Sequence, residues 1–111
     1  MATAYKILGQ VNPLATTEST LYTSTGVQAV VSSIAVCNQT ASSATFRIAV
    51  QPAADAASNA AAKHFLVHGT TVGAADTVVL TIGVTMAAGD RIRVYASNGN
   101  LSFSAFGSEI S

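Results

Sequence analysis

The sequence predicts an all-β fold, a single antiparallel β-sandwich or jelly-roll-like domain of about eight strands. Apolar and polar residues alternate with period two in several segments, and turn-forming residues separate those segments at short intervals. No segment repeats apolar residues at the spacing of an amphipathic helix. The 111 residues are enough for one domain, 1–111, and too few for a second independent core.

Individual strands follow from this alternation. Four segments have one apolar face and one polar or small face, and they span 45–51, 77–84, 91–96 and 101–105. The longer segment 27–38 is less regular, because Ser32 and Ser33 interrupt its pattern and apolar residues lie on both sides, and this predicts either a β-bulge or a strand covered on both faces. Shorter strands are expected at 5–8, 20–23 and 63–67.

Turn signals separate the expected strands. Ala88–Asp90 and Asn98–Asn100 contain glycine beside Asp or Asn, which is typical of hairpin connections. We therefore expect 91–97 and 100–106 to pair with each other antiparallel. Residues 52–62 are rich in alanine but have no apolar stripe that could dock a helix, so a surface loop with no more than one helical turn is expected there.

The charge content indicates what the chain contacts. Five basic and five acidic residues give a formal net charge of zero, and only 9% of residues are charged, against about a quarter in ordinary soluble domains. Five scattered cations argue against nucleic-acid binding and against an anionic membrane surface, and no apolar run is long enough to span a bilayer. A small monomer needs surface charge to stay apart from its copies, so the composition predicts an assembled protein.

The reactive residue types do not form a pattern that indicates catalysis. His64 and His68 would lie about 13 Å apart on one face of a strand, too far to share a metal, and both are expected at the surface. Cys37 lies in an apolar strand and is expected to be a small buried hydrophobe. Asp76 and Asp90 precede strands, where aspartate is a common turn residue. We therefore expect no enzyme, no cofactor and no metal site.

Segments along nearly the whole chain carry a family resemblance. They are Ala4–Gln10, Leu21–Thr23, Val27–Asn38, Ser43–Val50, Asp76–Thr85, Val94–Ser97, Asn100–Phe103 and Phe106–Glu109. Together they resemble small virion structural proteins of tailed bacteriophages, particularly those of cyanobacterial phages. This resemblance implies a non-enzymatic component located in the virion, with other virion proteins as partners.

Two placements in a virion agree with the composition. The first is a tail fibre or baseplate component that packs around a fibre axis as a homotrimer, and the second is a capsid decoration (cement) protein. In both, residues 1–10 can act as an arm, a strand lent to the sheet edge of a neighbouring subunit. A third possibility is a carbohydrate-binding β-sandwich. The candidate interface residues are Tyr5, Ile7, Leu8, Tyr95 and Phe106, of which Tyr95 and Phe106 are also the glycan-binding candidates.

Overall fold

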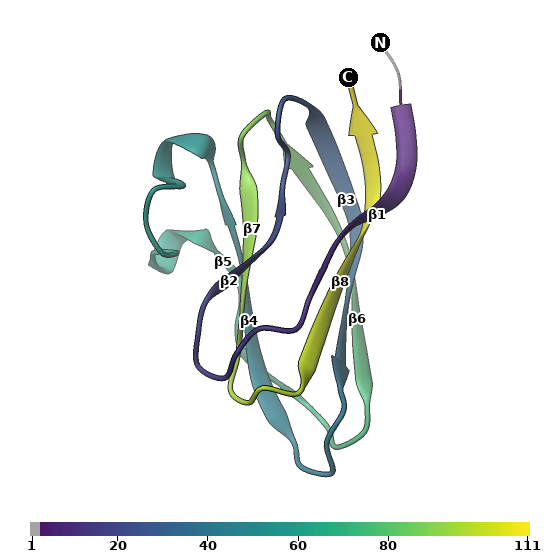
Figure 1. The fold of residues 1–111 in the computed structure, drawn as a ribbon, viewed down its shortest axis with the longest axis vertical. Helices are drawn as coiled ribbons and strands as arrows, with labels where there is room; N and C mark the ends of the chain where they lie inside the picture. The colour runs from purple at the N-terminus through teal and green to yellow at the C-terminus, as the bar shows by residue number, and fades with distance from the viewer. Residues whose placement is uncertain (1–2) are drawn as a thin grey trace.

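The computed structural model describes residues 3–111 and confirms the all-β prediction (Figure 1). The strands are β1 (Thr3–Val11), β2 (Ser19–Thr23), β3 (Gln28–Asn38), β4 (Ala44–Gln51), β5 (Phe65–Val72), β6 (Thr77–Met86), β7 (Arg91–Ala96) and β8 (Leu101–Ile110). Two 3-10 turns, η1 (Ala53–Asp55) and η2 (Ala62–His64), lie between β4 and β5.

The strands form two four-stranded antiparallel sheets that pack face to face (Figure 1). One sheet has the order β1-β8-β3-β6 and the other has the order β2-β7-β4-β5. The first strand pairs with the eighth, the second with the seventh, the third with the sixth and the fourth with the fifth. This nested pairing is that of a long hairpin wrapped around a sandwich, so the fold is an eight-stranded jelly roll.

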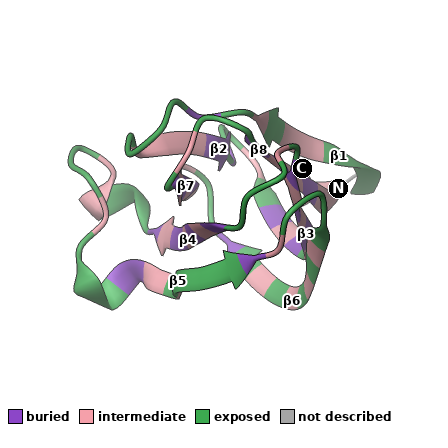
Figure 2. Ribbon diagram, turned by 90° about the horizontal axis from the view of Figure 1, so that it is seen from below, coloured by how far each residue is buried: buried purple, intermediate pink, exposed green. Residues whose placement is uncertain are grey.

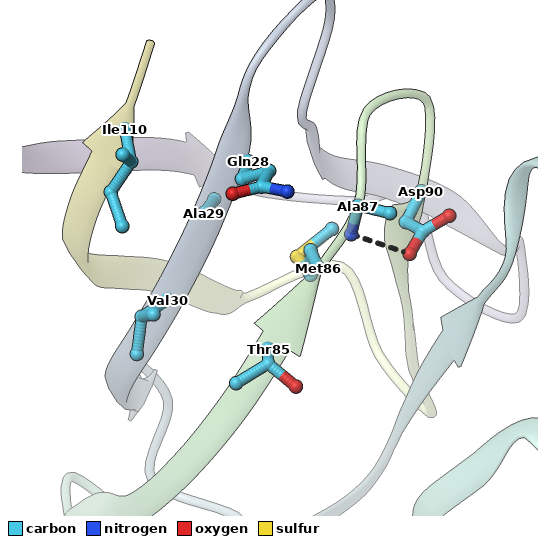
Figure 3. A pocket seen from close by; sticks show the side chains of 8 residues that line it. All are labelled: Gln28, Ala29, Val30, Thr85, Met86, Ala87, Asp90 and Ile110. Atoms are coloured by element: carbon cyan, nitrogen blue, oxygen red, sulfur yellow. Dashed lines mark hydrogen bonds between the residues drawn. The ribbon is translucent and has the colours of Figure 1, made fainter. Parts of the chain in front are cut away.

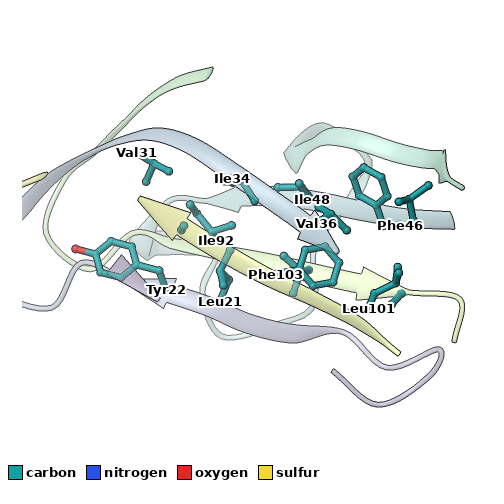
Figure 4. Close-up of a cluster of buried hydrophobic side chains, with 14 of the residues drawn as sticks. Leu21, Tyr22, Val31, Ile34, Val36, Phe46, Ile48, Ile92, Leu101 and Phe103 are labelled. Carbon is teal, nitrogen blue, oxygen red and sulfur yellow. The ribbon is translucent and has the colours of Figure 1, made fainter. Parts of the chain in front are cut away.

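The hydrophobic core lies between the inner faces of the two sheets (Figure 4). Phe46 on β4 and Phe103 on β8 are fully buried and meet edge to face, with ring centroids 6.2 Å apart and planes at 69°. This aromatic contact links the two sheets. The other large, fully buried apolar side chains are Ile34, Ile48, Ile92, Leu101, Val31, Val36, Val72 and Val94.

The alternation of apolar and polar residues in the sequence matches the faces that the strands turn toward the core and toward solvent. In β6, exposed and half-buried residues alternate from Thr77 to Thr85, and the half-buried ones pack against the core. The predicted bulge in β3 is confirmed, because the pairing register shifts beside Ser32 against both β6 and β8. Figure 2 shows β3 striped by burial, whereas β5 is exposed along most of its length.

The predicted pairing of 91–97 with 100–106 is wrong. Strand β7 pairs with β2 and β4, whereas β8 pairs with β1 and β3, so the two strands lie in different sheets. The turn Ala88–Asp90 likewise crosses from β6 in one sheet to β7 in the other. A glycine-containing turn indicates that the chain reverses its direction. In this jelly roll the strand after each of these two turns lies in the opposite sheet, and not beside the strand before the turn. Gly99 is also not among the glycines with positive φ, which a two-residue type I′ hairpin turn requires.

Two segments singled out in the sequence occupy the periphery. The segment expected as an exchanged arm, residues 1–10, overlaps β1, which pairs with β8 of the same chain. Residues 1 and 2 of that arm lie outside the described residues. Strand exchange with a neighbouring subunit therefore stays a prediction. Residues 52–62 form a mostly exposed connection that protrudes from the second sheet (Figure 1).

Candidate interaction surface

The outer face of the sheet β1-β8-β3-β6 bears no charged side chain among residues 3–111. The inner residues of β8 and β6 pack into the core, so the residues between them point outward. These outward residues are apolar or carry hydroxyl groups, for example Val79 and Thr81 on β6 and Ser102 and Ser104 on β8. We call this surface the uncharged face.

The charged residues lie elsewhere on the fold. Lys6 and Glu109 belong to β1 and β8, but their side chains lie on the inner side of the sheet. Glu109 there accepts a hydrogen bond of 2.6 Å from the hydroxyl of Tyr22 on the opposite sheet, and it forms a 2.6 Å ion pair with Lys6. The remaining charged residues are on the second sheet or in connections: Glu18, Arg47, Asp55, Lys63, Asp76, Asp90, Arg91 and Arg93.

Three large apolar residues cluster at the β1–β8 end of the uncharged face. Tyr5 is 86% exposed and Ile7 is 56% exposed, both on β1. Phe106 on β8 pairs with Ile7 and is half-buried. A shallow groove of about 410 Å³ lies beside Tyr5 and Phe106, and its other lining residues are Lys6, Val30, Ser32, Gly107 and Ser108. Exposed aromatic and aliphatic groups next to a groove are typical of a surface that contacts another protein.

The other two candidate interface residues are not on this face. Leu8 is half-buried and packs against the core, because it lies on the inner side of β1. Tyr95 is on β7 in the second sheet, where the guanidinium of Arg47 lies 4.3 Å from its ring centroid. The fold therefore brings Tyr5, Ile7 and Phe106 together and separates them from Tyr95.

Arg93 is the centre of a polar cluster on the outer face of the second sheet. Its Nε donates to Glu18 at 2.8 Å, and its other nitrogens donate to Thr20 at 2.7 Å and Asn59 at 3.0 Å. Glu18 in turn accepts the backbone N–H of Ala60. Every partner is supplied by the chain itself, so the cluster fastens the connection between β4 and β5 to the sheet.

Arg91 on β7 and Gln51 on β4 also hold the connection between β4 and β5. The Arg91 Nε donates to the Gln51 side chain at 2.7 Å, and a terminal nitrogen donates to the Ser58 carbonyl at 2.7 Å. Gln51 is fully buried and donates to the same carbonyl. Burial, and secondarily the neighbouring Arg93, lowers the pKa of the Arg91 guanidinium. These contacts order the segment that the sequence predicted as a surface loop.

The expectation that both histidines lie at the surface is wrong for His64, which is only 6% exposed. Its Nδ1 accepts the Ala61 backbone N–H at 2.8 Å, which places the ring hydrogen on Nε2, 3.0 Å from Asp55 Oδ2. With both ring nitrogens bonded, the imidazole is buried at low cost. His68 is exposed and packs edge-on against Phe65, with centroids 4.8 Å apart.

The Asp55–His64 pair does not form a catalytic arrangement with the groups around it. The ring has no open nitrogen that could take a proton from a substrate, since Ala61 occupies Nδ1. Hydrogen bonds from His64, and then from Lys63, lower the pKa of Asp55, so it stays a carboxylate. In the described part of the chain, no three His, Cys, Asp or Glu residues lie close enough together to hold a metal ion.

A cleft of about 470 Å³ opens at one end of the sandwich (Figure 3). Its only acidic lining residue, Asp90, accepts the backbone N–H groups of Ala87 and Ala53 at 2.9 Å each and so stabilises the turn. The expectation that Cys37 is a buried small hydrophobe is wrong, because Val36 takes the inward position of β3 and Cys37 is half-buried on the uncharged face.

The comparisons with known proteins give no family for this chain. No family model matches it, and a search of curated proteins finds no significant match. Among the described residues, no helix is long and apolar enough to cross a membrane.

Proposed function

We propose that this chain is a non-enzymatic structural protein of a tailed-bacteriophage virion, a tail fibre or baseplate component that assembles with copies of itself as a homotrimer. The observation that carries the proposal is the uncharged face, with Tyr5, Ile7 and Phe106 gathered at one end of it. An uncharged face that carries large exposed apolar side chains is stabilised when another subunit covers it.

The size of the uncharged face fits an interface between subunits. Strand β3 has eleven residues, and at about 3.3 Å per residue and about 4.8 Å between strands the four-stranded face covers about 700 Å². A standard protein–protein interface buries about 800 Å² on each partner. One face therefore supplies nearly the area that a stable contact needs.

The eight-stranded jelly roll agrees with the proposal but does not select it. This architecture occurs in viral capsid proteins and also in lectins, so function has to be argued from the surface. The capsid decoration placement would use the same face against the shell. The glycan-binding alternative gains no support, because the Arg47 guanidinium covers one face of the Tyr95 ring.

A charge placed on the uncharged face tests the assembly. In Ile7→Lys, burial of the new ammonium opposes the contact, and we expect the oligomer to dissociate to monomers in sedimentation equilibrium. The matched control is Leu66→Lys, which alters a 47% exposed aliphatic residue on β5 of the other sheet. The proposal fails if both variants keep the wild-type mass, or if both dissociate equally.

Location in the virion is tested on phage particles. An antibody raised against the purified chain should label intact particles of the phage that encodes it, and electron microscopy gives the position of the label. Labelling at the tail supports the proposed placement, and labelling over the head supports the decoration protein instead. Particles that carry none of the chain would refute a virion role altogether.

A further inference from the structure

Strand β6 is an edge strand that lacks the usual protection against pairing with another chain. Its ten residues, Thr77–Met86, include no charged residue and no proline. In the described structure it pairs only with β3, so its second edge presents unpaired backbone groups along its length. Val79, in the middle of the strand, is 62% exposed. A long, uncharged edge of this kind is a template for strand pairing.

The other three sheet edges are modified in ways that discourage such pairing. Strand β2 has only five residues and a register shift between Thr20 and Tyr22. Strand β1 has a register shift between Ile7 and Gly9. Strand β5 has two register shifts against β4 and a glycine with positive φ, Gly69. Short length and bulges are devices that blunt sheet edges. Strand β6 also has one register shift, against β3, but it is ten residues long and carries neither a charged residue nor a proline, which leaves it as the most open edge.

The sequence of β6 is complementary to itself when read in the opposite direction. About Thr81 as the midpoint, Thr77 matches Thr85 on the outer side, and Val78 matches Val84 on the inner side. Leu80 matches Ile82 in the same way. Although the register against β3 shifts beside Ser32, the alternation of exposed and half-buried residues runs unbroken over 77–85.

We propose that β6 pairs antiparallel with β6 of a second copy of this chain, about a two-fold axis at Thr81. Each inner apolar residue then faces another, and on the outer side Thr77 faces Thr85 and Thr81 faces its own copy, all favourable cross-strand pairs. Val79 faces Gly83, the one pair of residues that differ in kind. No charged residue of 77–85 is brought opposite another. The two sheets β1-β8-β3-β6 join into one of eight strands, with both uncharged faces on the same side.

This contact deepens the proposed function and rests on it, because it is too small to act alone. A strip about 30 Å long and about 10 Å deep buries roughly 300 Å² per copy, below the roughly 800 Å² of a standard interface. The β6 contact therefore links subunits weakly, and the uncharged face supplies the main contact. It would connect one trimer to the next.

Disulfide trapping tests the register. In a Cys37→Ser background, Thr81→Cys places two sulfurs on the axis, where opposite Cα atoms are about 4.5–5.5 Å apart, within disulfide range. The matched control Thr85→Cys places its two cysteines roughly 26 Å apart in the same pairing. We expect Thr81→Cys to form disulfide-linked dimers under mild oxidation and Thr85→Cys to stay monomeric on a denaturing gel. Absence of a disulfide-linked dimer in the Thr81→Cys variant, or equal trapping of both variants, overturns the proposed pairing.

The mass of the same Cys37→Ser, Thr81→Cys protein under reducing conditions separates this proposal from the assembly proposal, because Thr81 also lies on the uncharged face and cysteine adds no charge there. A reduced protein that sediments as a trimer but forms no disulfide-linked dimer on oxidation refutes only the β6 contact. A wild-type chain that is monomeric at every concentration refutes the uncharged-face assembly first.

Discussion

Gly107 lies in the middle of β8, opposite Val31, at a point where the sheet leaves no space for a side chain. A Cβ at Gly107 would overlap the Val30 carbonyl oxygen and lie 3.0 Å from the Val31 Cα. Both are backbone atoms held in the β3–β8 ladder, so the strands must separate to admit a methyl group. Overpacking typically costs 1–3 kcal/mol, and loss of ladder hydrogen bonds adds to it, so Gly107→Ala should cost about 3 kcal/mol or more.

The matched control is Gly83→Ala on β6. Neither glycine has positive φ, and a Cβ at Gly83 meets no heavy atom within 4 Å. The control should be neutral or stabilising by about 0.5 kcal/mol, because alanine loses less backbone entropy than glycine on folding. Urea unfolding followed by circular dichroism measures both, and Gly107→Ala should also lower the melting temperature by about 12 °C or more. If the free energy of unfolding of Gly107→Ala lies within roughly 1 kcal/mol of the wild-type value, the close approach of β3 and β8 is wrong.

Two further predictions concern the core and the carboxylates. Phe103→Ala should cost about 4 kcal/mol in urea unfolding, because the ring is fully buried between the sheets; a loss below about 2 kcal/mol would contradict its place in the core. Hydrogen bonds from Lys6 and then Tyr22 lower the pKa of Glu109 below its ordinary 4.5. Its contribution to stability is therefore complete above pH 4.5 and is lost as the pH falls through the lowered folded pKa. Glu109→Gln should flatten the fall of the urea midpoint between pH 5 and pH 3 (a range of about two units around the ordinary carboxyl pKa), and an unchanged pH profile would contradict the ion pair.

Local patterns were sufficient to predict the strands but not their partners. The alternation in 77–84 and the interruption at Ser32 predict the two faces of β6 and the bulge in β3, because each depends on neighbouring residues. The partner of a strand depends on where the chain returns after a turn. The hairpin signal at Asn98–Asn100 could not distinguish a return to the same sheet from a crossing to the other one.

The candidate surface could be predicted only in part for the same reason. Tyr5 and Phe106 were predicted as interface residues from their type, but their common face depends on the pairing of β1 with β8, the first and last strands. The burial of His64 depends on Asp55, nine residues earlier in a segment that has no periodic pattern. The lack of charge was visible in the composition, whereas its concentration on one face required the fold.

Sedimentation equilibrium of the wild-type chain over a wide concentration range addresses the role of the uncharged face most directly. The subunit mass is 11.2 kDa, and the proposed homotrimer has three times that mass. We expect a trimer that persists on dilution, with larger species at high concentration where β6 edges pair. A single species at the subunit mass throughout the range would contradict the assembly that we propose.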